Sequence, residues 1–273
     1  MLSLWLQVDA SVLILSRPDF SGVNLMFLTS KKRLDRSRQI RLPVAGLALI
    51  VIAGCATTSN VQQIDRLDTV DGTPKIVLMP PDIRYYLLTA GGVTEPNAEW
   101  TEAAQANFAV ALRDFATANG SNVVQLDKSN MSRQEIEYEA LHSAVGRTIL
   151  NHYFGMLKLP SKGGTFDWSL GPDIASIGED HDADYALFVH YRDYQASGGR
   201  IAFSLLAAVA GVGVSAGSES GFASLVDLET GDIVWFNVVH AGSGELRDPN
   251  GAKVAVRKLF KDLPGGNPSN EAQ

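Results

Sequence analysis

The apolar positions of residues 73–264 follow two different spacings. Short continuous apolar runs are typical of buried strands, whereas apolar residues that recur about every 3.6 positions are typical of amphipathic helices. The runs predict strands over residues 75–80, 122–126, 184–191, 222–228 and 233–239. The longer period predicts helices over residues 97–119, 132–156 and 248–263, with a short helix over 172–178.

Two local motifs support these boundaries. Ser132 and Glu135 have the spacing of a capping box, in which each side chain binds the backbone N–H of the other residue at the start of a helix. Residues 229–232 separate the last two strands, and Gly231 can adopt the positive φ that a tight hairpin requires.

The predicted order of elements is β-α-β-α-β-β-β-α. Strands that alternate with helices and then form a hairpin predict an α/β (α+β) fold, with a mixed sheet of about five strands and helices packed on it. The length of residues 73–264 is that of a single domain.

A separate apolar run, residues 42–52, precedes this domain and leads into Ala53, Gly54 and Cys55, the only cysteine. Six basic residues lie just before it, between Lys31 and Arg41. The run is too short to cross a membrane as a helix, which takes roughly 20 residues, but it has the length of the apolar region of a secretory signal. This order of basic, apolar and small residues before a cysteine resembles the signal peptide and lipobox of a bacterial lipoprotein. The alternative is a buried core helix with an unrelated cysteine.

The lipobox resemblance implies cleavage between Gly54 and Cys55 and acylation of Cys55, with palmitate or a similar chain. Two or three acyl chains hold a protein stably to a membrane. Ala56, rather than an aspartate, implies sorting to the outer membrane, with the domain on the periplasmic side. Residues 1–25 are expected to be a mis-assigned start, with Met26 as the normal one, and a longer signal peptide is the alternative.

Without the signal peptide, residues 1–54, the chain is strongly acidic. The full sequence has 23 basic and 30 acidic residues, a net charge of −7, of which the signal contributes seven basic and three acidic, so the remainder carries −11. An acidic surface argues against nucleic acid and against anionic lipid headgroups as partners. Residues 55–72 are expected to form the lipidated cysteine and a flexible tether, and residues 265–273 a disordered tail.

The domain carries a second resemblance. Residues 182–185 read Asp-Ala-Asp-Tyr at the start of a strand, and residues 225–235 read LVDLETGDIVW after an Ala- and Gly-rich insert. This pattern resembles bacterial envelope lipoproteins that include the curli-secretion channel lipoprotein and the DUF799 kind, whose domain is similar to the amino-terminal domain of the Tol-Pal translocation protein. The resemblance implies a non-enzymatic part in envelope or surface-structure assembly, through protein–protein binding.

Two segments are candidates for binding envelope proteins. Phe166 and Trp168 lie in a glycine-rich loop, and aromatic side chains are enriched at the energetic centres of protein interfaces. The alternative is that both rings fill the domain's own core. Residues 201–214 are apolar all round and include Phe203, Leu205 and Leu206. This segment can be packed inside the domain, form a contact in a homo-oligomer, or contact the membrane.

The motifs of catalysis and cofactor binding lack their required context. Residues 211–216 match the glycine pattern of a dinucleotide-binding loop, but a strand rather than a helix is predicted after them. Glu219 stands where a G-x-S-x-G motif needs its serine. His142 and His152 do not have the spacing of a helical zinc pair. We therefore expect no cofactor, no metal and no catalytic residue. A small-ligand or lipid carrier, or a periplasmic hydrolase with an unrecognised site, is the alternative.

Overall fold

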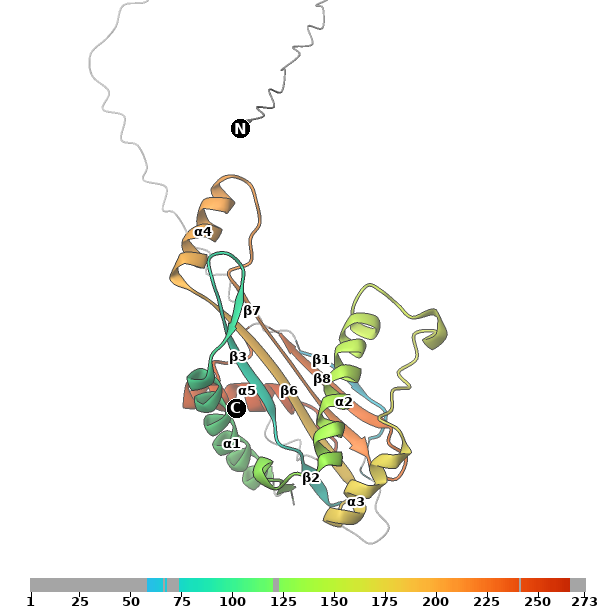
Figure 1. The fold of residues 1–273 in the computed structure, drawn as a ribbon. Coiled ribbons are helices and arrows are strands. Elements are labelled where there is room, and N and C mark those ends of the chain that lie inside the picture. The colour runs from blue at the N-terminus through green and yellow to red at the C-terminus, as the bar shows by residue number, and fades with distance from the viewer. Residues whose placement is uncertain (1–57, 66, 68–73, 120–122, 241, 266–273) are drawn as a thin grey trace, which may run out of the picture. The chain divides into compact units, whose positions relative to one another are not determined.

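An eight-stranded mixed sheet forms the centre of the domain in the computed structural model, which describes residues 58–65, 67, 74–119, 123–240 and 242–265 (Figure 1). The strands are β1 (Thr58–Gln62), β2 (Ile76–Leu78), β3 (Asp82–Leu88), β4 (Thr94–Pro96), β5 (Val123–Gln125), β6 (Tyr185–Ala196), β7 (Gly217–Asp227) and β8 (Ile233–His240). The α-helices are α1 (Ala98–Asn119), α2 (Arg133–Ile149), α3 (Ala175–His181), α4 (Gly198–Val209) and α5 (Pro249–Leu259). Short helical segments are η1 (Lys128–Asn130), the π-helical η2 (Leu150–Phe154), η3 (Pro160–Lys162) and η4 (Pro172–Ile174). The α/β class is as predicted, although the described residues form eight strands rather than about five.

The long strand β6 organises the sheet. It pairs antiparallel with β7, which continues through β8 to β1 at one edge. On its other side β6 pairs in parallel with β2 and then with β3, while β5 pairs with β2 and β4 pairs with β3.

Strands β2 and β3 follow one another along β6. Ile76 is opposite Tyr185 and Asp82 is opposite His190, with Pro80 and Pro81 between the two strands. Proline has no N–H to donate and so interrupts the ladder. The prolines predicted the end of the first strand correctly. The sequence pattern did not predict β3, which begins directly after them and pairs with β6.

Helices cover both faces of the sheet (Figure 1). The side chains of β6 alternate between the two hydrophobic cores, so that Leu187 packs in the core that includes α1 and α5, and Phe188 in the core that includes α2 and α3. Helix α2 approaches the sheet closely, since a Cβ on Gly146 would lie 2.0 Å from Cε2 of Phe222. The predicted capping box is present, with Ser132 Oγ accepting from Glu135 N at 3.2 Å and the Glu135 carboxylate accepting from Ser132 N at 2.5 Å.

The predicted hairpin between β7 and β8 also forms. Gly231 has a φ of 80°, and a side chain there would meet the carbonyl oxygen of Gly171 at 2.1 Å. Glycine is therefore required at this position by both conformation and space.

The amino-terminal predictions are only partly within the described residues. Thr58–Gln62, inside the expected tether of residues 55–72, form β1 and pair with β8 from Val239 to Trp235. These five residues are therefore part of the sheet and not of a flexible tether. Gly54, Cys55, the signal peptide and most of the predicted tail lie outside the described residues.

Candidate binding surfaces

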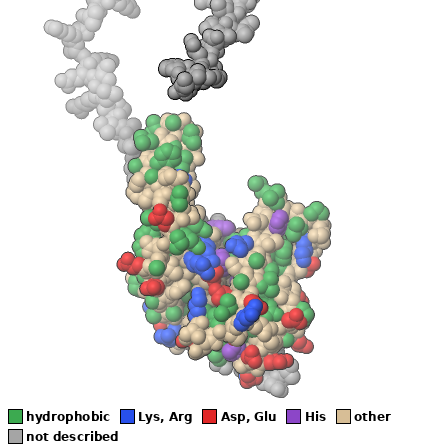
Figure 2. Space-filling view, viewed as in Figure 1, with side chains coloured by type: hydrophobic (Ala, Val, Ile, Leu, Met, Phe, Trp, Pro, Cys, Tyr) green, Lys and Arg blue, Asp and Glu red, His purple; other side chains and the backbone are tan. Residues whose placement is uncertain are grey.

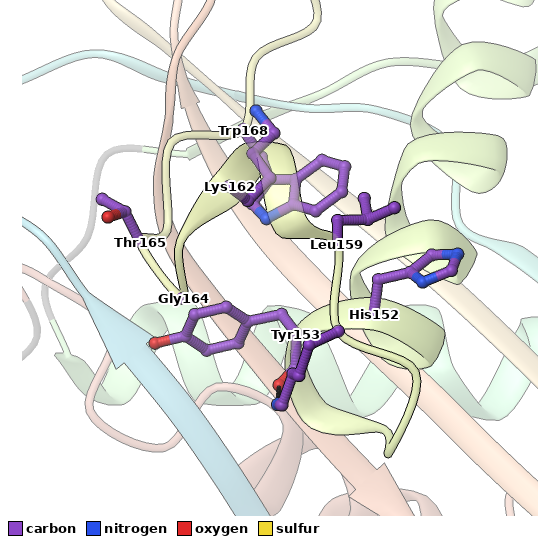
Figure 3. Close-up of a pocket in the computed structure, with 8 residues that line it drawn as sticks. His152, Tyr153, Leu159, Lys162, Gly164, Thr165 and Trp168 are labelled. Atoms are coloured by element: carbon purple, nitrogen blue, oxygen red, sulfur yellow. Dashed lines mark hydrogen bonds between the residues drawn. The ribbon is translucent and has the colours of Figure 1, made fainter.

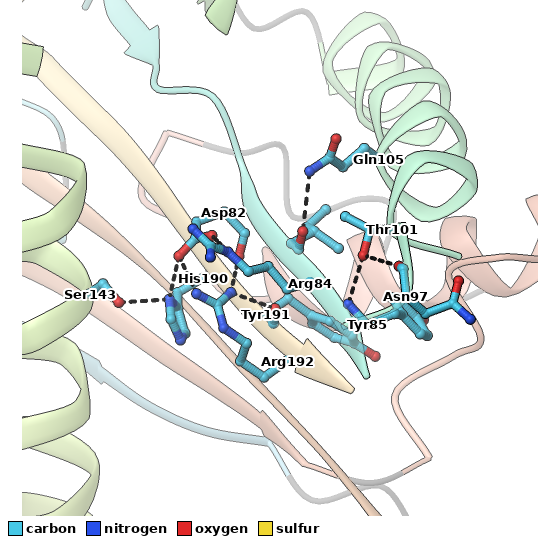
Figure 4. A network of polar contacts seen from close by, with 11 residues as sticks. Asp82, Arg84, Tyr85, Asn97, Thr101, Gln105, Ser143, His190, Tyr191 and Arg192 are labelled. Carbon is cyan, nitrogen blue, oxygen red and sulfur yellow. Dashed lines mark hydrogen bonds and ion pairs between the residues drawn. The ribbon is translucent and has the colours of Figure 1, made fainter. Parts of the chain in front are cut away.

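A buried polar network joins β3, β6 and α2 (Figure 4). Nδ1 of His190 lies 3.1 Å from Oδ2 of Asp82 and 3.0 Å from Oγ of Ser143. Asp82 also accepts from Nη2 of Arg192 at 2.5 Å and from Nε of Arg84 at 3.1 Å. Strand register places Asp82 opposite His190, and α2 brings Ser143 above them.

The charges in this network are fixed by its geometry. Burial acts to raise the pKa of Asp82, but the hydrogen bonds from His190 and Arg192 outweigh it and hold that pKa well below its usual range. Burial lowers the pKa of His190, against the opposing effect of Asp82. The network therefore combines an ionised carboxylate, an arginine and a neutral imidazole.

The network contains serine, histidine and aspartate but does not have the geometry of a nucleophilic triad. In a triad the serine binds one ring nitrogen, which takes the hydroxyl proton, and the carboxylate binds the other ring nitrogen and holds the imidazole in position. Here Ser143 and Asp82 both approach Nδ1 of His190, and all three residues are buried. The arrangement therefore locks α2 to the sheet.

A second buried histidine lies beside it. Nε2 of His142 is 2.7 Å from Oγ of Ser224, and its ring stacks on Phe188 with centroids 4.7 Å apart. Burial, reinforced by the nearby His190, lowers the pKa of His142 to about 3. His142 is thus a neutral core residue. Among the described residues, no group of three or more His, Cys, Asp or Glu side chains is arranged to hold a metal ion.

A surface hollow of about 280 Å³ lies beyond the carboxyl end of α2 (Figure 3). Tyr153 and Trp168 line it, and Nζ of Lys162 lies 4.8 Å from the centroid of the Trp168 ring. A cation held over an indole face is attracted by the ring quadrupole. A second hollow of about 330 Å³ lies between α1 and the loop that carries Asp127.

Two exposed apolar residues lie between Tyr153 and Lys158 in the sequence, and both of those flanking residues line the first hollow. Met156 is 98% exposed and Leu157 is 72% exposed. Both follow η2, the π-helical end of α2, and π-helical turns occur frequently at functional sites. We call Met156, Leu157 and the hollow lined by Tyr153, Lys162 and Trp168 the α2-end surface.

A second apolar surface is formed by α4. This helix connects the end of β6 to the start of β7 and stands beyond the sheet (Figure 1). Phe203, Leu205 and Leu206 are 48%, 64% and 72% exposed, and hydrophobic side chains gather on this part of the molecule (Figure 2). None of the described helices is long and apolar enough to cross a membrane.

The structure separates the predicted interaction residues. Phe166 is buried, with its ring 5.1 Å from that of Tyr153, as the core alternative expected. Trp168 is half-buried and reaches the α2-end surface. Phe203, Leu205 and Leu206 lie on exposed α4, so residues 201–209 are not packed inside the domain.

Sequence reasoning missed Met156 and Leu157. The predicted helix ends at Met156, and Leu157 falls in the connection that follows it. The sequence contains one indication of this exposed pair: two adjacent apolar residues directly follow Gly155, where the helical spacing of apolar residues ends. The buried network was missed because Ser143 and Asp82 lie 47 and 108 positions from His190.

No family model matches the chain, and no curated protein matches it. Solved structures with a similar arrangement include a variant of the PelC dodecamer from Paraburkholderia phytofirmans, with 13% identity, coverage of 77% of this chain and 99% of that chain, and a TM-score of 0.36. Lipoprotein GNA1162 from Neisseria meningitidis has 12% identity, covers 61% and 78%, and has a TM-score of 0.25. The LpoB C-terminal domain from Salmonella enterica has 15% identity, covers 63% and 86%, and has a TM-score of 0.24. Similarities this low do not indicate a function.

Proposed function

We propose that this protein is a lipid-anchored, non-enzymatic accessory protein of the bacterial outer membrane, which faces the periplasm and binds another envelope protein during envelope or surface-structure assembly. The lipobox at Cys55 supports the anchor. The α2-end surface supports the binding of a protein partner.

The observation that carries the proposal is the exposure of Met156 and Leu157 a few residues after Tyr153, which lines the hollow together with Trp168. Isolated apolar residues on a surface are common. Methionine and aromatic residues together are enriched at the centres of protein interfaces, where they fill pockets of the partner and are shielded from water. A partner with an apolar pocket for Met156 and Leu157 fits this surface.

A photo-crosslinking experiment in the native cell tests the partner surface. A photoreactive amino acid at Leu157 is expected to form an adduct with one envelope protein, identified by mass spectrometry. Val110 on α1, an apolar residue 52% exposed and on the opposite face of the sheet, is the matched control position. Met156→Asp is expected to abolish the adduct without loss of folded protein.

The possible outcomes separate the alternatives. Equal adducts from positions 157 and 110, or none from position 157, would contradict a partner site at the α2 end. An adduct of two copies of this chain would contradict a separate partner and assign the surface to self-assembly.

The intact mass of the protein extracted from its membrane tests the anchor independently. A chain that begins at Cys55 and carries the mass of acyl groups is expected. An uncleaved chain or an unmodified Cys55 would overturn the anchor.

A further inference from the structure

The end of the domain that carries α4 has one charged residue in two neighbouring connections. Residues 198–214 and the β3–β4 turn, residues 89–93, form what we call the apolar tip. The two connections touch, because a Cβ on Gly199 would lie 3.3 Å from Cβ of Ala90. Arg200 is the only charged residue in the tip. Its Nε donates to the carbonyl oxygen of Ser215 at 2.9 Å, at the base of α4.

Helix α4 exposes apolar side chains over more than half of its circumference. Successive helical residues are rotated by about 100°, so Ile201, Leu206 and Phe203 span about 200° of the helix surface, and all three are exposed. Val209, in the last turn, is 90% exposed. A protein groove covers one stripe of a helix, whereas lipid surrounds it. Apolar exposure over so wide an arc therefore favours lipid as the occupant.

Strand register places the start of β1 at the same end of the sheet. Thr58 is opposite Val239, and Val239 is opposite Gly221, the fifth residue of β7, in the half of that strand where the chain arrives from α4. Since β1 runs away from this end, Thr58 is the residue of β1 that lies towards the apolar tip. Cys55 is three residues before Thr58 and is therefore within about 10 Å of it, given at most about 3.6 Å per residue.

The dimensions of α4 fit one lipid leaflet. Its 12 residues rise about 18 Å at 1.5 Å each. One leaflet contributes about half of a hydrocarbon core roughly 30 Å thick. At the start of the connection, Tyr86 and Tyr194 stack with centroids 4.9 Å apart, and tyrosine and arginine are residues that favour the height of the headgroups.

We infer that the apolar tip inserts into the same lipid leaflet that holds the acyl chains of Cys55. This inference rests on the lipid anchor of the proposed function and extends it. The acyl chains and α4 form two attachments at one end of the sheet, so they fix the direction of the domain. The strands then point away from the membrane, with the β7–β8 hairpin at the far end.

The test uses the acylated protein, which is expected to begin at Cys55, in vesicles of phosphatidylethanolamine and phosphatidylglycerol. Leu206→Cys introduces a free thiol for a fluorescent label, because the thiol of acylated Cys55 is blocked. Asp180→Cys, an exposed position on α3 at the opposite end of β6, is the matched control. The vesicles contain lipids with or without bromine atoms on their acyl chains, which quench only a label within the hydrocarbon.

Brominated lipid is expected to reduce the emission at position 206 and to leave the emission at position 180 unchanged. Equal emission with both lipids at position 206 would overturn the inference. A blue-shifted but unquenched label would also overturn it, and would show that protein, such as a second copy, covers α4.

The mass of the protein is measured first. Absence of acyl chains counts against the proposed anchor. The quenching at position 206, measured in a Cys55→Ser variant so that only position 206 is labelled, still decides whether α4 enters lipid. The far-ultraviolet circular dichroism of both labelled variants checks that the domain remains folded.

Discussion

Asp82 and His190 face each other across β3 and β6, and a hydrogen bond of 3.1 Å joins Oδ2 of Asp82 to Nδ1 of His190. The same carboxylate oxygen accepts from Arg192 at 2.5 Å. One buried carboxylate on β3 thus binds an imidazole and an arginine on β6, and these contacts hold β3 against the central strand of the sheet.

Replacement of this carboxylate by an amide is expected to destabilise the domain strongly. Asp82→Asn leaves Arg192 without its countercharge in a buried setting, and removal of one member of a buried ion pair typically costs about 3–5 kcal/mol. Urea unfolding measures the loss. Asp180→Asn, at an exposed position, is expected to change the free energy of unfolding by less than about 0.5 kcal/mol. A similar small change in Asp82→Asn would show that the network does not stabilise the fold.

His142 is expected to make the protein sensitive to acid. Its native pKa is lowered to about 3, whereas an unfolded histidine binds a proton near pH 6.5. Between these values the unfolded state binds the extra proton, so stability falls as the pH decreases, by up to about 1.4 kcal/mol per pH unit. Urea unfolding from pH 7 to pH 4 measures this slope. His142→Gln is expected to reduce it, and His240→Gln, on the exposed end of β8, is the control that retains it.

Asp193 has the opposite effect. Burial raises its pKa to about 6, with the charges of Glu219 and Glu245 adding to the rise and a hydrogen bond from Gln195 opposing it. The native state therefore holds a proton that the unfolded state loses, so this group weakens the fold as the pH rises from about 4 to 6. Asp193→Asn is expected to raise the free energy of unfolding by about 1–2 kcal/mol at pH 7.5, with no gain at pH 4. A loss of stability at pH 7.5 would contradict this account.

Gly146 is expected to tolerate no side chain. In an exposed helix, alanine is more stabilising than glycine by about 1 kcal/mol. The methyl group of Gly146→Ala would overlap the ring of Phe222, and overpacking of this kind typically costs about 1–3 kcal/mol. Thermal unfolding is expected to show a net loss of stability. Gly198→Ala in α4, where a Cβ meets nothing within 4 Å, is expected to show none.

Elements with local signals were predicted well. The capping box of α2 depends on two residues three positions apart, and the β7–β8 hairpin depends on one glycine with positive φ. Both structures are determined by the backbone close to them, so a short stretch of sequence is sufficient to predict them.

Elements determined by distant partners were missed. β1 has one apolar residue, Val61, and forms because β8 lies beside it. The start of β3 contains Asp82 and Arg84, and charged residues of this kind are typical of a loop. They lie in a strand because β6 pairs with β3 and its Arg192 binds Asp82. The sequence showed that residues 201–214 are apolar, but it did not show whether the rest of the domain packs on them or leaves them exposed.

The two prolines between β2 and β3 also protect the edge of the sheet. Because the strand is divided there, its outer neighbours β5 and β4 are separate and three residues long each. A long unpaired edge is a template on which a neighbouring chain can add a strand and begin aggregation, whereas short edges give such a chain little to pair with. Proteins attached to a membrane are confined to two dimensions and meet often. Pro80 and Pro81 would therefore limit strand addition at this edge of the sheet when copies held by the proposed anchor are crowded on one surface.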